Sequence, residues 1–135
     1  LLGAHIAFGC PHGFGPDDTE LERFSVLGAA SVESHQRALD AVRGADAVHA
    51  DTWVSMGQEG EKSDRVKAFE GFTVDDAMMS AAAPDGVFMH CLPAYRGLEV
   101  TADVIDGPRS RVFQQGHARL PAARGALAFL LEASR

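Results

Sequence analysis

The chain has 135 residues, the size of one ordinary domain. Hydrophobic residues make up 46% of it and charged residues 23%, which allows a buried core under a normal polar surface. The formal net charge of -7 argues against nucleic acid as a partner, because phosphate binding needs clustered Lys and Arg. No apolar run approaches the roughly 20 residues of a membrane-spanning helix, so we expect no membrane partner.

The ends and the cysteines of the chain give two further expectations. The first residues include no initiator Met and no positively charged leader, so we expect an N-terminally incomplete part of a longer polypeptide. Cys10 and Cys91 are too few for a disulfide framework and do not have a zinc-binding spacing. We therefore expect no metal site and a reducing, cytoplasmic location.

Short apolar runs alternate with longer helical patterns, which is typical of βαβ units and a parallel sheet. Strands are predicted at residues 5–9, 31–34, 45–51 and 86–90. Helices are predicted after an Asp17 or Asp18 cap, at 36–43 and 61–69, from a Thr73 cap through Met79, at 101–105, and at 120–131 with Pro121 in the first turn. These elements predict a single three-layer α/β domain with a Rossmann-like parallel sheet and helices on both faces.

Two polar segments follow predicted strands, residues 51–57 (DTWVSMG) and residues 90–93 (HCLP). Ligands of open parallel sheets bind beyond the carboxyl ends of the strands, so we expect both segments at one edge.

His90 and Cys91 could supply an acid or base and a thiol, but buried histidines and cysteines are more often structural. A nucleophilic cysteine needs a lowered thiol pKa. A cysteine hydrolase using both residues is disfavoured, because neighbours on a strand project to opposite faces. Pro93 follows directly, and X-Pro bonds can adopt the cis form.

Asp51 offers a carboxylate for a ligand ammonium group, although Asp also commonly begins turns. Gly57 gives the segment after it backbone freedom. A flexible segment of this kind suits a loop that closes over a ligand, and it equally suits an ordinary exposed loop.

In this order and spacing, the two segments resemble the Asp-x-x-x-Ser-Met-Gly and His-Cys-Leu-Pro motifs of ornithine carbamoyltransferases. The likeness continues at residues 64–66 (DRV) and 107–110 (GPRS) and covers essentially the whole chain. Aspartate carbamoyltransferases carry Pro in place of Cys91, and relatives that use putrescine or acetylated ornithine lack the Ser-Met-Gly loop. The resemblance thus implies that residues 1–135 are an ornithine-binding domain without its carbamoyl-phosphate domain.

The resemblance implies carbamoyl transfer from carbamoyl phosphate to the δ-amine of L-ornithine, in arginine biosynthesis, with no metal or organic cofactor. It implies roles for these residues: Asp51, Ser55 and Met56 for ornithine; Cys91, Leu92 and Arg119 for carbamoyl phosphate; and Gly57, His90 and Pro93 as motif support. Cys91 and Arg119 are the catalytic candidates. Arg119 follows Gln115-Gly116-His117-Ala118 instead of the usual acidic and Asn residues, so a plain surface arginine is its alternative.

The family's Ser-x-Arg-Thr-Arg and His-Pro-x-Gln segments are not found in the chain, nor is the first strand of the ornithine domain with its Asn. We therefore expect no useful activity from the chain alone. The alternative is an amino-acid-binding fragment or a split-enzyme subunit that needs a partner domain. The family's homotrimer is not carried over. We also expect the apolar face of the last helix to be partly uncovered, at Leu127, Phe129, Leu130 and Leu131.

Overall fold

The computed structural model describes residues 3–54, 57 and 59–133. The strands are β1 (His5–Gly9), β2 (Ser31–His35), β3 (Ala47–Ala50) and β4 (Val87–His90). The α-helices are α1 (Asp18–Val26), α2 (Ala38–Val42), α3 (Lys62–Ala68), α4 (Asp76–Ala81), α5 (Ala102–Ile105) and α6 (Val112–Ala133). A short 3₁₀ helix, η1 (Glu59–Glu61), precedes α3.

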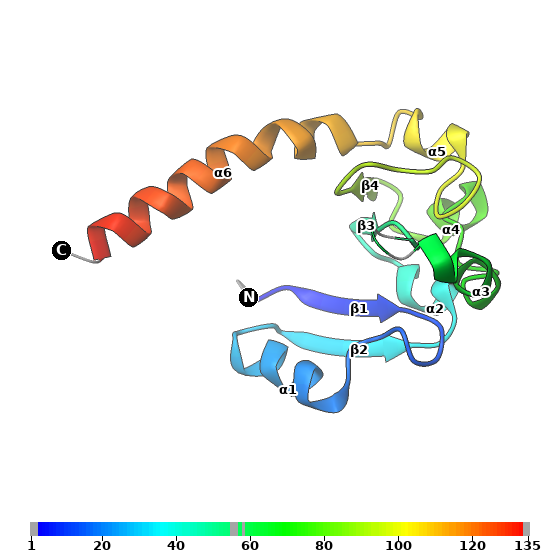
Figure 1. Ribbon diagram of the computed structural model, residues 1–135, viewed down its shortest axis with the longest axis horizontal. Coiled ribbons are helices and arrows are strands. Elements are labelled where there is room, and N and C mark those ends of the chain that lie inside the picture. Colours follow the sequence, from blue (N-terminus) through cyan, green and yellow to red (C-terminus); the bar gives the residue numbers. More distant parts are fainter. Residues whose placement is uncertain (1–2, 55–56, 58, 134–135) are drawn as a thin grey trace.

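The strands pair in parallel, and helices separate them along the chain, as the alternating pattern predicts (Figure 1). β1 pairs with β2 and β3 pairs with β4. The α/β class with parallel strands is thus confirmed. Within the described residues, however, hydrogen bonds join the strands in two pairs and not in one continuous sheet.

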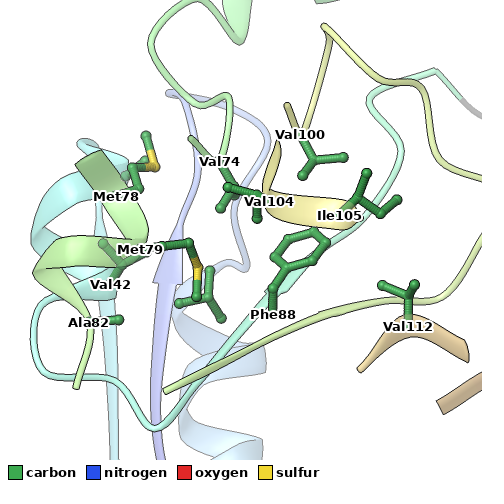
Figure 2. Close-up of a cluster of buried hydrophobic side chains, with 12 residues drawn as sticks. Val42, Val74, Met78, Met79, Ala82, Phe88, Val100, Val104, Ile105 and Val112 are labelled. Carbon is green, nitrogen blue, oxygen red and sulfur yellow. The ribbon is translucent and has the colours of Figure 1, made fainter. Parts of the chain in front are cut away.

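The main core lies around β4, whose Phe88 is completely buried. Figure 2 shows the Phe88 ring beside Val104 and Ile105 of α5, with Met79 of α4 on its other side. Burying a side chain of this size contributes roughly 2–3 kcal/mol. The Phe88 backbone also bonds to the segment before α6, since its N–H donates to the Arg109 carbonyl and its carbonyl accepts from Arg111. β4 is therefore a fixed support for the residues that follow it.

Two helix starts illustrate how local sequence sets the boundaries. Asp17 caps α1 as predicted, because its carboxylate accepts from the Glu20 amide at 2.8 Å while the Glu20 side chain accepts from the Asp17 amide. The predicted Thr73 cap is wrong. Asp75 caps α4 instead, accepting from the Met78 amide at 2.9 Å, and residue Val74 forms a bridge to Val100.

The last helix is longer than predicted. α6 begins at Val112, so Pro121 lies inside the helix and not in its first turn. The prediction failed because proline is disfavoured in helix interiors by about 3 kcal/mol, a local preference that the rest of this helix overrides.

Figure 1 shows α6 projecting away from the strands. As predicted, its apolar face is uncovered, with Leu127, Phe129 and Leu130 each more than half exposed. Among the described residues, no helix combines the length and apolar character that crossing a membrane requires.

Candidate functional site

The parallel pairing of β3 with β4 brings the two polar segments together. Ala50 and His90 are register partners, so the residues that follow them, Asp51 and Cys91, are neighbours at the carboxyl ends of the strands. The Cys91 thiol donates a hydrogen bond to Oδ1 of Asp51 over 2.9 Å. The predicted meeting of the two segments at one edge is therefore present in the structure.

The two side chains shift each other's pKa in opposite directions. The hydrogen bond from Cys91 lowers the pKa of Asp51, with the Thr52 amide, 2.7 Å from Oδ1, adding to the effect. Burial and the adjacent Asp51 carboxylate raise the pKa of Cys91. At neutral pH the pair is therefore a carboxylate and a protonated thiol, and the Asp51 charge suits a cationic ligand group.

This pairing argues against a nucleophilic cysteine. A thiolate nucleophile needs a lowered pKa, whereas the pKa of Cys91 is raised. Its sulfur lies 4.0 Å from Nδ1 of His90, and that nitrogen already accepts from the Leu92 amide at 2.8 Å. Nδ1 of His90 is therefore not free to accept a proton from the Cys91 thiol.

His90 and Glu99 form a buried pair beneath the turn at Leu92 and Pro93. Both are almost inaccessible to solvent, and Nε2 of His90 lies 3.3 Å from Oε1 of Glu99. Because Nδ1 accepts from Leu92, the proton of a neutral ring sits on Nε2, facing the carboxylate. Burial lowers the pKa of His90, so the neutral ring is favoured. The pair thereby fixes the orientation of the ring that holds the turn.

The turn itself has an unusual backbone. Leu92 has φ of 57°, in the left-handed region that residues other than glycine seldom adopt, and the Leu92-Pro93 peptide is cis. A residue other than glycine persists in the left-handed region where surrounding contacts determine it, often at functional sites. Here the His90 ring binds the Leu92 amide.

Arg119 reaches the same place from α6. Its Nη1 donates to the carbonyl of Cys91 over 3.2 Å. The side chain is exposed, yet it is directed to the site and its charge opposes the rise in the Cys91 pKa. Nearby, the side-chain nitrogen of Gln115 lies 3.0 Å from Nε2 of His49, so α6 also contacts β3.

An aromatic cluster anchors the chain just after Asp51. Trp53 is buried and stacks on Phe69 with ring centroids 5.4 Å apart, and Arg65 of α3 donates to its carbonyl. Ser55 and Met56, both expected to contact ornithine, lie outside the described residues. Gly57 has φ of 88°, a conformation that its lack of a side chain permits.

Two residues that hold the fold around the site, Glu99 and Arg109, were not singled out from the sequence. Glu99 was missed because a lone Glu in a polar stretch reads as a surface residue. Arg109 appeared only within a quoted motif, but its guanidinium donates to three backbone carbonyls, those of Met79, Ala83 and Gly86, at 2.6–2.7 Å. Neither had a periodic or spacing signal. Within the described residues, no group of three or more His, Cys, Asp or Glu is placed to hold a metal ion.

Residues 1–130 match the family described as Aspartate/ornithine carbamoyltransferase, Asp/Orn binding domain. The chain belongs to this family. Its relatives include the ornithine carbamoyltransferase of Parasynechococcus marenigrum, 46% identical over 133 residues, or 97% of this chain and 42% of the relative. The chloroplastic enzyme of Pisum sativum is 43% identical over 127 residues, covering 94% of this chain and 34% of that protein.

Solved structures agree with the family assignment. The anabolic ornithine carbamoyltransferase of Campylobacter jejuni superposes with a TM-score of 0.88 at 33% identity, over 100% of this chain and 45% of that one. The enzyme of Pyrococcus furiosus superposes with a TM-score of 0.82 at 42% identity, over 94% of this chain and 42% of that one. The chain thus spans less than half the length of these relatives.

Proposed function

We propose that this chain is the ornithine-binding part of an ornithine carbamoyltransferase, acting in the cytoplasm in arginine biosynthesis. The observation that carries the proposal is the convergence of Asp51, Cys91 and Arg119 at the carboxyl ends of β3 and β4 in a chain of this family. A carboxylate can pair with the ammonium group of an amino acid, and a guanidinium can pair with the phosphate group of an acyl phosphate.

In the proposed reaction the neutral δ-amine of ornithine attacks the carbonyl carbon of carbamoyl phosphate. A C–N bond forms, the C–O bond to phosphate breaks, and the amine loses a proton as citrulline and phosphate leave. Asp51 would bind the ammonium of the amino-acid end together with Ser55 and Met56. The carbonyl of Leu92 and the thiol of Cys91 would lie beside the δ-amine and the carbamoyl group, while Arg119 would offset the charge of the phosphate.

The same proposal assigns a separate domain to carbamoyl phosphate. Positioning two substrates accounts for much of the rate of such a transfer, so a chain with one half of the contacts is expected to be inactive alone. A purified chain that makes citrulline from ornithine and carbamoyl phosphate by itself would contradict this part of the proposal.

The decisive experiment mixes the chain with a separately expressed carbamoyl-phosphate domain from a relative and measures citrulline. We expect activity in the mixture, and Asp51→Asn to abolish most of it. Asp46→Asn is the matched control, because Asp46 is an exposed carboxylate at the opposite end of β3. Equal loss in both variants would show that Asp51 has no specific role.

The alternative proposal is an amino-acid-binding fragment, and calorimetry with the chain alone separates the two. L-ornithine binding that weakens at least about tenfold in Asp51→Asn, with no activity in any mixture, would favour the fragment. The position of the Asp51 carboxylate beside the Cys91 thiol supports ornithine binding in either case, because the carboxylate can pair with an ammonium group.

A further inference from the structure

Helix α6 contacts the strand ends through two polar side chains that lie on one of its faces. The side-chain nitrogen of Gln115 lies 3.0 Å from Nε2 of His49 on β3. Nη1 of Arg119 donates to the carbonyl of Cys91, directly after β4, over 3.2 Å. Residues four positions apart are neighbours on a helix surface. The face of α6 that holds Gln115 and Arg119 is therefore the one that meets the carboxyl ends of β3 and β4.

Gln115 carries the last partly buried side chain of α6. Every residue from 117 to 133 is exposed, so the helix leaves the body of the domain at Gly116. Arg119 lies beyond this point. A hydrogen bond between an exposed arginine and a carbonyl is weak, because water competes for both groups and the long side chain loses rotamer freedom. The bond to Cys91 is therefore not enough by itself to hold the guanidinium in place.

The helical turn around Arg119 is also weak in its own backbone. Gly116 is a poor helix former, because glycine has the most conformational freedom to lose. Pro121 has no N–H, so the helical hydrogen bond to the carbonyl of His117 cannot form. Both residues lie within three positions of Arg119. The direction of this turn therefore depends on the contacts that nearby side chains make with the strands.

Gln115 is fixed at both its backbone and its side chain. Its amide donates to the Arg111 carbonyl at 2.9 Å, and the Arg111 amide donates to the carbonyl of the buried Phe88 at 2.8 Å. Its side-chain nitrogen faces His49, whereas its Oε1 is buried without a hydrogen-bond partner among the described residues. The contact with His49 is thus the one that orients the side-chain amide, and it ties α6 to β3.

We propose that His49 and Gln115 form a positioning pair, which holds the α6 turn of Arg119 against β3 and so keeps the guanidinium on the Cys91 carbonyl. The pair acts through Arg119 and needs no contact of its own with a substrate. The sequence predicted no role for either residue, because neither belongs to a motif. The placement of Arg119 follows from the geometry of the chain alone, whereas its effect on phosphate binding rests on the function proposed above.

The first test measures the position of Arg119 in the chain alone. The carbonyl ¹³C signal of Cys91 reports the hydrogen bond. The pH profile of Cys91 alkylation by iodoacetamide, in a Cys10→Ser background, reports the nearby charge. Because Arg119 lowers the pKa of Cys91, its displacement moves the profile to higher pH and slows alkylation at fixed pH. Arg119→Ala gives the values for complete loss.

We expect His49→Leu and Gln115→Ala each to produce most of the change that Arg119→Ala produces, in the carbonyl signal and in the alkylation profile. His49→Gln should keep the original values, because a glutamine amide can take the place of Nε2 and bond to Gln115. Gln114→Ala is the matched control. Gln114 is the exposed neighbour of Gln115, so its loss should change neither signal.

Double variants separate positioning from a direct effect on Cys91. In an Arg119→Ala background, His49→Leu and Gln115→Ala should cause no further change, since the residue through which they act is gone. Changes that add to that of Arg119→Ala would overturn the proposal, as would single variants that behave like the Gln114→Ala control. Alanine is a strong helix former, so Gln115→Ala retains α6 and decides the question even if His49→Leu does not fold.

Mixtures with a separately expressed carbamoyl-phosphate domain test the consequence for the site. Where the unsubstituted chain is active in the mixture, Gln115→Ala should raise the KM for carbamoyl phosphate at least about threefold and change the KM for ornithine little. An unchanged KM for carbamoyl phosphate would overturn the link to phosphate binding. If no mixture is active, the proposed function fails, whereas the carbonyl and alkylation measurements still decide whether the pair positions Arg119.

Discussion

The thiol of Cys91 donates to the carboxylate of Asp51 across two paired strands, over 2.9 Å. The two residues are 40 positions apart in the chain, and the parallel register of β3 with β4 makes them neighbours. Each group stabilises the form of the other that prevails at neutral pH, a carboxylate beside a protonated thiol. Burial is the larger cause of the raised Cys91 pKa, and the Asp51 carboxylate adds to it.

Removing the Asp51 charge should make Cys91 more reactive. The carboxylate raises the thiol pKa, so in Asp51→Asn the thiolate forms at lower pH and alkylation by iodoacetamide accelerates at fixed pH. The measurement is the pH profile of alkylation in a Cys10→Ser background, which we expect to move to lower pH. Cys10, read in a Cys91→Ser background, is the control, because burial and not Asp51 raises its pKa. A profile for Cys91 that does not move would contradict the assigned cause.

Glu99 should stabilise the buried orientation of the His90 ring. Glu99→Ala leaves the buried Nε2–H of His90 facing no acceptor, which costs about 2–4 kcal/mol of unfolding free energy. Glu99→Gln keeps an acceptor oxygen and is expected to cost less. Urea denaturation gives the energies, and ¹⁵N NMR of the ring reports the tautomer. A ring that carries its proton on Nδ1 in the unsubstituted chain would contradict the geometry at Leu92.

Arg109 should be a stability residue and not a site residue. Its guanidinium binds three carbonyls at the end of α4 and before β4, so Arg109→Ala leaves half-buried acceptors without their donor and should cost about 2–4 kcal/mol. Arg111→Ala is the control. That side chain is exposed and donates to carbonyls at Pro108 and Ser110, so we expect a change within about 0.5 kcal/mol. Thermal and urea unfolding compare the two, and equal losses would refute the distinction.

The uncovered face of α6 should promote self-association. Leu127 and Leu130 are three positions apart on one face of the helix and are each 61% exposed. Replacing both by serine is expected to lower the associated fraction seen by light scattering at a given concentration. Arg124→Ser, on the same helix, tests whether any change of surface has this effect. A chain that is monomeric at high concentration before substitution would rule the effect out.

The strands were the most predictable part of the fold. The predicted strands at residues 5–9, 45–51 and 86–90 contain β1, β3 and β4, and the predicted cap at Asp17 or Asp18 marked the start of α1. The start of α6 was misplaced because Gly116 and Pro121 are poor helix residues, and local preference alone predicts a shorter helix there. The division of the sheet into two pairs was not predicted either, since strand order is not a local property.

The site residues that directly follow predicted strands could be predicted from the sequence. The residues that hold these site residues in place from distant parts of the chain could not. Asp51 and Cys91 were expected at one edge because parallel strands end together, and the structure places them in contact. Ser55 and Met56 lie outside the described residues, so their roles stay predictions. Glu99 lies beside His90 although residues 91–98 separate them along the chain, and nothing local in the sequence signals that contact.

The long helix α6 has a mechanical consequence for the site. Its first turn is fixed by the buried Val112, while its far half is exposed. Arg119 sits between these parts, with its guanidinium on the Cys91 carbonyl. A 22-residue helix is about 33 Å long, so a small tilt at Val112 displaces the far end by several times more than it displaces Arg119. A partner that binds the far end of α6 would therefore adjust the position of the Arg119 guanidinium, and each shift of the far end would move Arg119 by a smaller distance.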